Sequence, residues 1–189
     1  MIDENAFGIL IEYFDIEDAE YGLDREQFVE RFEEFRTAVL DHLEKNPLGE
    51  NVRALYLGHA LYVEIAEGDE TESPLNWARK ARQSLDARDF LTVATVTHGS
   101  RWVEEKSPVD PPTAEAPASN VLHVSTPSEP LRRALSAETA CHDDDDDDGS
   151  GWGPGLYVDL EALEALGLKP KNAPTALHAA GATFYRAAT

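Results

Sequence analysis

The sequence predicts a single α+β domain spanning residues 1–189, in which a mixed β-sheet of about five to six strands carries two to three helices. An α/β fold is the alternative. Apolar segments typical of strands alternate along the chain with segments of helical periodicity. A length of 189 residues suits one domain with its own core. A long proline-rich connector and short late strands favour a mixed sheet over a regular parallel one.

The first strand and the first helix are the clearest local signals. Residues 7–14 are short, apolar and rich in β-branched and aromatic side chains, which predicts a strand. Asp24 is a good N-cap, and Gln27 completes a capping box three residues later. Phenylalanines then recur on one face of a predicted helix that ends at Asn46.

The centre of the chain predicts a strand, a helix and another strand. Residues 53–67 are apolar on both alternating faces, which predicts one long central strand with Gly58 as a bulge. A second helix is expected to begin at Ser73, because Pro74 suits the first helical position. Residues 91–105 form the most strand-like segment of the chain and are expected at the centre of the sheet.

The second half of the chain contains two segments without periodicity. Residues 107–119 predict a proline-rich loop inside the domain, and residues 142–155 predict an acidic, flexible loop. A third helix is expected to begin after the cap Ser128. The remaining predicted elements are strands at 120–126, 156–158 and 182–186 and a short helix at 160–166.

The net charge of −21 is extreme for this length and is uneven, since residues 1–50 contain 15 acidic and 4 basic residues. Such a field repels nucleic acid and anionic lipid, so we expect no direct nucleic-acid binding and no membrane association. The chain has no apolar run long enough for a membrane span and no signal-peptide pattern at its start. Cys141 is the single cysteine, which with these features predicts a cytoplasmic protein.

The charge favours a non-enzymatic binding or regulatory protein that engages a basic protein partner. A neutraliser of a cationic toxin or of a nucleic-acid-binding protein would have this character, as would an adaptor in a complex. Simple solubility, or life at high salt, is the alternative origin of the acidity. The expected partner-binding residues are Glu26, Glu30, Glu33, Glu34 and Asp41 on the first helix, and Asp143, Asp144, Asp145, Asp146, Asp147 and Asp148 in the acidic loop.

The alternative function is a small enzyme or metal-binding protein that acts on an anionic substrate. His98, Ser100 and Arg101 lie at the end of a predicted strand, where a histidine can serve as a base and an arginine can bind an anion. The segment His98 to Arg101 resembles the strand-end HGSR of the small cobalt and sirohydrochlorin chelatases, in which the histidine binds the inserted metal. In that family the motif follows the first strand, whereas here a helix–strand–helix unit precedes it. The predicted anion-binding residues are Arg79, Lys80, Arg82 and Arg101.

Cofactors are not expected, apart from weak Ca²⁺ or Mg²⁺ binding by the aspartate run. Asp144, Asp146 and Asp148 match the first half of a calcium loop, but Gly155 occupies the position of the bidentate glutamate. A second hypothesis places three histidines, each in a predicted strand, around one metal; the alternative is that each is satisfied singly within the sheet. These histidines are His59, His98 and His123.

Overall fold

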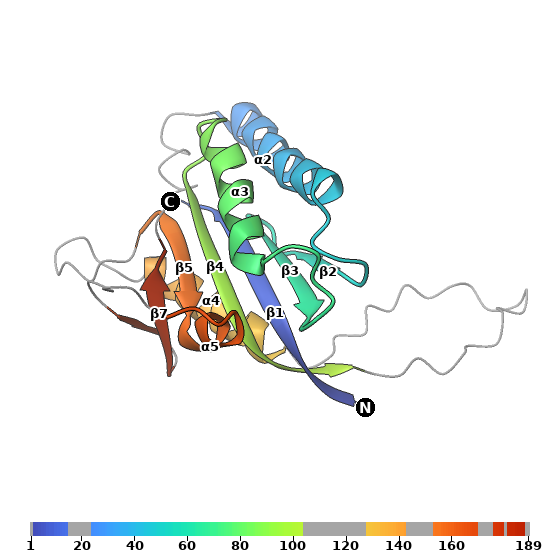
Figure 1. Cartoon of the computed structure of the whole chain (residues 1–189). Helices are drawn as coiled ribbons and strands as arrows, with labels where there is room; N and C mark the ends of the chain where they lie inside the picture. The colour runs from blue at the N-terminus through green and yellow to red at the C-terminus, as the bar shows by residue number, and fades with distance from the viewer. Residues whose placement is uncertain are drawn as a thin grey trace, which may run out of the picture.

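The computed structural model describes residues 2–14, 24–103, 128–142, 153–169, 176–179 and 181–187. Across these residues, seven strands form one mixed sheet in the order β2-β3-β1-β4-β5-β7-β6 (Figure 1). The strands are β1 (Ile2–Tyr13), β2 (Arg53–Tyr56), β3 (Ala60–Ala66), β4 (Thr92–Val103), β5 (Gly155–Asp159), β6 (Leu177–Ala179) and β7 (Ala182–Arg186). The helices are α2 (Arg25–Lys45), α3 (Pro74–Asp86), α4 (Glu129–His142) and α5 (Leu160–Ala165).

The long strands β1 and β4 form the centre of the sheet. They pair antiparallel along their whole length, from Ile2 opposite Val103 to Tyr13 opposite Thr92. β3 pairs antiparallel with the other edge of β1, and β5 joins β4 as the parallel neighbour. The mixed sheet and the α+β fold predicted from the sequence are therefore confirmed, with one strand more than the upper expected number.

Helices α2, α3 and α5 contribute to the main core on one face of the sheet, and α4 crosses the opposite face (Figure 1). Alternate residues of a strand point to opposite faces, so Phe7, Ile9 and Ile11 of β1 enter the main core while Leu10 packs toward α4. α2 starts as predicted, because the Asp24 carboxylate and the Gln27 side chain form both halves of the capping box.

Helix α4 approaches the sheet closely where it begins. Gly8 makes this possible, since a Cβ at that position would lie 2.8 Å from the Cβ of Pro130 and 2.5 Å from the hydroxyl oxygen of Tyr62. The buried hydroxyl of Thr97 donates to the carbonyl of Pro130 at 2.9 Å, which ties the start of α4 to β4. These contacts fix the position of α4 over the polar side chains of the sheet.

The segment predicted as one strand at 53–67 is a hairpin. Gly58 adopts a left-handed φ of 80°, and Leu57 N–H donates to the Ala60 carbonyl, so the chain reverses between β2 and β3. The expected bulge is therefore wrong, and the reversal places His59 in the turn. The predicted loop at 107–119, the predicted strand at 120–126 and all but the two ends of the acidic loop at 142–155 lie outside the described residues. Within the described ranges, no helix is long and apolar enough to cross a membrane.

Candidate functional site

Three chemically active side chains converge at the end of β1 that faces α4. The Nε2 atom of His59 lies 3.2 Å from Oε1 of Glu12 and 3.5 Å from Oε1 of Glu138. One ligand atom from each of these residues lies within 4.8 Å of the other two. We refer to Glu12, His59 and Glu138 as the triad.

The triad comes from three separate elements. Glu12 is the penultimate residue of β1, and it lies on the α4 face because Leu10, two residues earlier, packs against Ala134 of α4. His59 lies in the hairpin turn, and its backbone carbonyl accepts a hydrogen bond from the Tyr13 N–H at 3.0 Å. Glu138 belongs to α4. Backbone structure therefore fixes the histidine between the two carboxylates.

The electrostatics of the triad favour a positive charge at its centre. Hydrogen bonds to Glu12 and to Glu138 raise the pKa of the His59 imidazole to about 10, although partial burial opposes this shift. The Glu12 side chain is fully buried, whereas that of His59 is 40% exposed. A buried carboxylate requires a compensating positive group, and the triad can supply it as an imidazolium or hold a metal cation.

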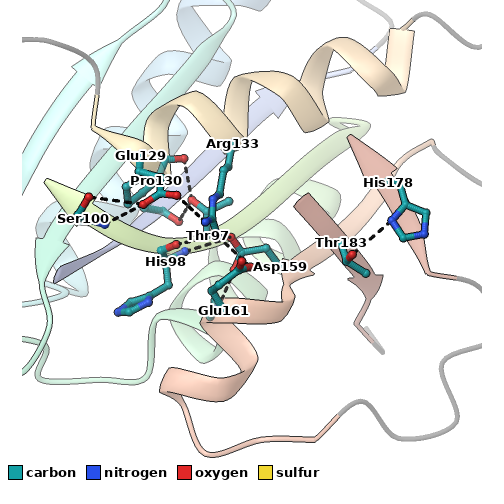
Figure 2. Close-up of polar contacts among 12 residues, drawn as sticks. Thr97, His98, Ser100, Glu129, Pro130, Arg133, Asp159, Glu161, His178 and Thr183 are labelled. Atoms are coloured by element: carbon teal, nitrogen blue, oxygen red, sulfur yellow. Dashed lines mark hydrogen bonds and ion pairs between the residues drawn. The ribbon is translucent and has the colours of Figure 1, made fainter. Parts of the chain in front are cut away.

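A second polar cluster connects the start of α4 with β5 (Figure 2). Arg133 on α4 forms ion pairs with Asp159 at 3.2 Å, with Glu161 at 2.8 Å and with Glu129 at 2.6 Å. It also donates to the carbonyl of His98 at 3.2 Å. Since one guanidinium joins α4, β4, β5 and α5, the main role of this cluster is to hold these elements together.

Asp159 is the fully buried member of the second cluster. Its carboxylate caps α5 by accepting from the Ala162 N–H at 2.7 Å. Burial raises the pKa of Asp159 to about 6, against the opposing effect of the backbone N–H groups of Ala162 and His98 and of Arg133. This carboxylate therefore changes charge close to neutral pH.

A third polar group surrounds Glu64 on the same face of the sheet. The buried Glu64 carboxylate accepts from the Tyr62 hydroxyl at 2.7 Å and from the Ser128 hydroxyl, and it lies 3.4 Å from Nη1 of Arg101. Arg101 also donates from Nε to Glu4 at 2.7 Å. These groups satisfy one another, as buried charges require.

The structure separates the residues of the predicted strand-end site. His98 packs against Phe7 on the main-core face, with ring centroids 4.8 Å apart, and its Nε2 pairs with Glu67 at 3.1 Å. Arg101 lies on the opposite face beside Glu64. Ser100 contacts Glu129 through its backbone N–H at 3.3 Å. The imidazole of His98 points away from the cluster around Arg133 (Figure 2).

The predicted anion-binding residues are also divided. Arg79, Lys80 and Arg82 lie on α3, where they bond to nearby residues of the same region, whereas Arg101 lies on the other face of the sheet. On α2, three of the acids expected to bind a partner form ion pairs with bases on the same helix: Glu33 with Arg36, Glu34 with Arg31 and Asp41 with Lys45. Glu26 and Glu30 are exposed.

Asp143 to Asp148 lie outside the described residues, as does His123. Weak Ca²⁺ or Mg²⁺ binding by Asp144, Asp146 and Asp148 therefore stays a prediction. The described histidines do not converge, because His59 joins two glutamates and His98 pairs with Glu67.

The outer face of α4 carries a shallow hollow of about 250 Å³, lined by Arg132, Leu135, Ser136 and Thr139. Arg132 and Leu135 are exposed. Within the described residues, the Arg132 side chain forms no ion pair. A larger hollow of about 560 Å³ beside α2 is lined in part by Glu30, Glu33 and Glu34.

The sequence interpretation missed Glu12 and Glu138. The available signal was Glu12 itself, because an acid interrupts an apolar strand at a position that must be buried on one face. Glu64 in the apolar segment of β3 gives the same signal. The position of Glu138 on α4 carries no comparable local signal.

Sequence comparisons find no matching protein-family model and no matching curated protein. Solved structures do match. The adenylyl cyclase CyaB from P. aeruginosa has a TM-score of 0.62 at 9% identity, covering 98% of this chain and 94% of that chain. The chain shares the fold of nucleotide cyclases. The guanylate cyclase domain of RhGC from Catenaria anguillulae, in complex with GTP, has a TM-score of 0.62 at 7% identity, covering 100% of this chain and 99% of that chain. The guanylyl cyclase Cya2 has a TM-score of 0.57 at 8% identity, with coverages of 98% and 92%.

The cyclase fold contradicts the leading prediction of a non-enzymatic acidic protein that binds a basic partner. The chains that share this fold carry the names of enzymes. Net charge reports on solubility and long-range attraction rather than on fold. The acidity therefore does not discriminate between an enzyme and a non-enzymatic binding protein. Part of the acidic face of α2 is also neutralised within the helix.

Proposed function

We propose that the protein is an enzyme that binds a purine nucleoside triphosphate and converts it to a cyclic nucleotide and pyrophosphate. The observation that carries this proposal is the extent of the fold match. Five adenylyl or guanylyl cyclase structures match with TM-scores from 0.57 to 0.62, over 88% to 100% of this chain. One of those cyclase domains is in complex with GTP.

The proposed reaction is an intramolecular phosphoryl transfer. The 3′ oxygen of the ribose attacks the α-phosphorus, the bond from that phosphorus to the oxygen bridging to the β-phosphorus breaks, and pyrophosphate leaves. The proton of the 3′ hydroxyl passes to a base or to solvent. Catalysis of such a step depends on positioning and on positive groups near the phosphates.

Among the residues that the structure describes, those on the outer face of α4 suit the nucleotide best. Arg132 offers an exposed guanidinium to the phosphates, and the neighbouring Leu135 offers an apolar surface to the base. The larger hollow beside α2 suits a nucleotide less well. Its glutamates repel phosphate, and the guanidinium of Arg31 is already bonded to Glu34 and to the carbonyl of Arg88.

A cytoplasmic location, proposed from the single cysteine, fits this substrate. Nucleoside triphosphates are abundant in that compartment.

Calorimetric titration with non-cyclisable ATP and GTP analogues tests the proposal. We expect wild-type protein to bind one of the analogues and Arg132→Ala to weaken binding by about 10- to 100-fold, because a charged hydrogen bond to phosphate is lost. Arg25→Ala is the matched control, since Arg25 is an exposed arginine on α2. Its affinity should stay within about twofold of wild type.

Two outcomes would contradict this assignment. Absence of binding at millimolar analogue would exclude the substrate class. Equal affinities of Arg132→Ala and Arg25→Ala would exclude the outer face of α4 as the binding surface.

A further inference from the structure

We propose that His42 makes the contact between α2 and α3 sensitive to acid, so that protonation of its imidazole separates the last turn of α2 from α3. The two helices contact each other on the main-core face of the sheet (Figure 1). His42 and Asn46, at the end of α2, and Trp77 of α3 form the part that we call the α2–α3 contact. This inference goes beyond the proposed nucleotide function, because α4 lies on the opposite face of the sheet.

The α2–α3 contact encloses the imidazole almost completely. The His42 ring lies edge-on to the indole of Trp77, with ring centroids 5.1 Å apart and an interplanar angle of 69°. Trp77 is fully buried and His42 is 8% exposed. The indole N–H of Trp77 donates to the backbone carbonyl of Asn46 at 2.6 Å, and the Asn46 N–H donates to the His42 carbonyl at 2.9 Å. A charge on this ring is therefore poorly solvated while the contact is closed.

Hydrogen bonding fixes the neutral form of the imidazole. The side-chain amide nitrogen of Asn46 lies 3.1 Å from the His42 carbonyl oxygen and 3.4 Å from Nδ1 of His42. Donation to the carbonyl sets the orientation of this amide, so Nδ1 is the acceptor and Nε2 carries the ring proton. Within the part of the chain that the structure describes, Nε2 is buried and has no hydrogen-bond partner. A second proton, at Nδ1, would meet the amide N–H and remove the hydrogen bond from Asn46 to the ring.

The charged groups around His42 already have partners. Lys80 of α3 pairs with Glu72, which lies just before that helix, and on α2 the neighbouring Asp41 pairs with Lys45 at 3.1 Å. Each acid is therefore engaged by a base instead of balancing an imidazolium. Burial lowers the pKa of His42, Lys80 adds to this effect and Glu72 opposes it. The closed contact consequently holds neutral histidine and is weakened as the pH falls below the ordinary histidine range.

The anchors on either side confine the opening to the last turn of α2. In the first half of the helix, the Arg31 guanidinium donates to the carbonyls of Arg88 and Asp89, at 2.9 Å each. Arginine stays charged in acid, so this anchor does not titrate. After the helix, Leu48 is fully buried and its carbonyl accepts from the Thr71 N–H at 2.8 Å. Acid therefore loosens α2 between two attachments that are themselves independent of the histidine.

The test follows the fluorescence of Trp77, and its quenching by acrylamide, as the full-length protein is brought from neutral to mildly acidic pH. Trp102→Phe and Trp152→Phe in the test protein leave Trp77 as the single tryptophan. We expect emission at longer wavelength and stronger quenching in acid, while far-ultraviolet circular dichroism is retained. The ratio of open to closed contact should rise by up to about tenfold per pH unit, because opening is coupled to the uptake of one proton.

Two variants of the neighbouring charges should move the midpoint of this transition in opposite directions. Lys80→Met leaves Glu72 to stabilise the imidazolium, so opening should occur at higher pH. Glu72→Gln leaves Lys80 beside the ring, so opening should require lower pH. A histidine that served only in packing would move neither midpoint, and coinciding midpoints would contradict the proposal.

Substitutions of the histidine itself complete the experiment. His42→Gln removes the titrating group and His42→Leu also removes the polar ring, so neither protein should show the acid response of Trp77. His178→Gln, which removes an exposed histidine bonded to Thr183, is the matched control and should keep the full response. A response that persists in the His42 variants would overturn the proposal. Loss of circular dichroism over the same pH range would also overturn it, because the protein would then unfold as a whole.

Discussion

Buried carboxylates are the most informative single residues of this protein. Glu12, Glu64 and Asp159 are each buried on the α4 side of the molecule, and each contacts a positive group or a hydroxyl. Charged side chains in such positions cost free energy unless they are paired. The partners of these carboxylates therefore identify contacts that stabilise the folded state. The contribution of Asp159 can be measured through the dependence of stability on pH.

Asp159 should make stability depend on pH in the direction opposite to most carboxylates. Burial raises its pKa from 3.8 to about 6, so its contribution to stability is present at low pH and is lost as the pH rises through about 6. Relative to Asp159→Asn, wild type should gain about 1.4 kcal/mol in free energy of unfolding between pH 8 and pH 5. Urea unfolding of both proteins at the two pH values measures this difference. A difference that is constant or has the opposite sign would show that Arg133 dominates over burial.

Gly8 should be intolerant of a side chain for reasons of space. A Cβ there would meet the Tyr62 hydroxyl at 2.5 Å and Pro130 at 2.8 Å. Gly8→Ala is expected to lower the free energy of unfolding by about 1–3 kcal/mol, as overpacking does. Tyr62→Phe by itself removes the hydrogen bond to the buried Glu64, so the double variant should lose less stability than the sum of the two single losses, because the atom nearest the added Cβ is gone. A Gly8→Ala protein as stable as wild type would show that α4 is not packed this closely.

At the level of elements, local signals predicted helices better than they predicted strand pairing. The cap at Asp24 and the proline at the start of α3 are confirmed. The sequence predicts one strand over residues 53–67 with a bulge at Gly58, because apolar alternation continues through the turn; in the structure the left-handed Gly58 reverses the chain. A hairpin forms where two particular strands pair, and the local residue pattern does not identify the strands that pair.

The triad could not be assembled from the sequence for the same reason. Glu12, His59 and Glu138 belong to β1, a hairpin turn and α4, which meet only after the sheet forms. The alternation of β1 could identify Glu12 as a buried acid, but not its partners. The predicted site at His98 and Arg101 relied on sequence proximity, and strand alternation sends these two side chains to opposite faces.

At the level of the whole molecule, the net charge of −21 should make stability depend strongly on salt. Mutual repulsion of like charges destabilises the compact state, and the screening length falls from about 10 Å at 0.1 M to about 3 Å at 1 M salt. The melting temperature should therefore rise between 0.05 M and 0.5 M NaCl, by roughly 2–4 °C for each kcal/mol gained. Scanning calorimetry at pH 7.5 measures the effect. A melting temperature that is flat or falls with salt would show that the ion pairs outweigh the repulsion.

The proposed nucleotide substrate changes how the net negative charge of the protein is interpreted. The proposed binding of a nucleoside triphosphate requires local positive groups, because a strongly negative field repels such an anion at long range. Arg132 is the exposed base beside the hollow on α4. On this account, the function depends on a local surface whose charge is opposite to that of the molecule as a whole.

The most direct test of the proposed cyclase activity is phosphorus NMR of the products formed from the Mg²⁺ complexes of ATP and of GTP by the full-length protein. The account predicts pyrophosphate together with a cyclic nucleotide monophosphate from at least one of the two substrates, and loss of this product in Arg132→Ala but not in Arg25→Ala. Unchanged nucleotide, or release of inorganic phosphate and nucleoside diphosphate, would contradict it.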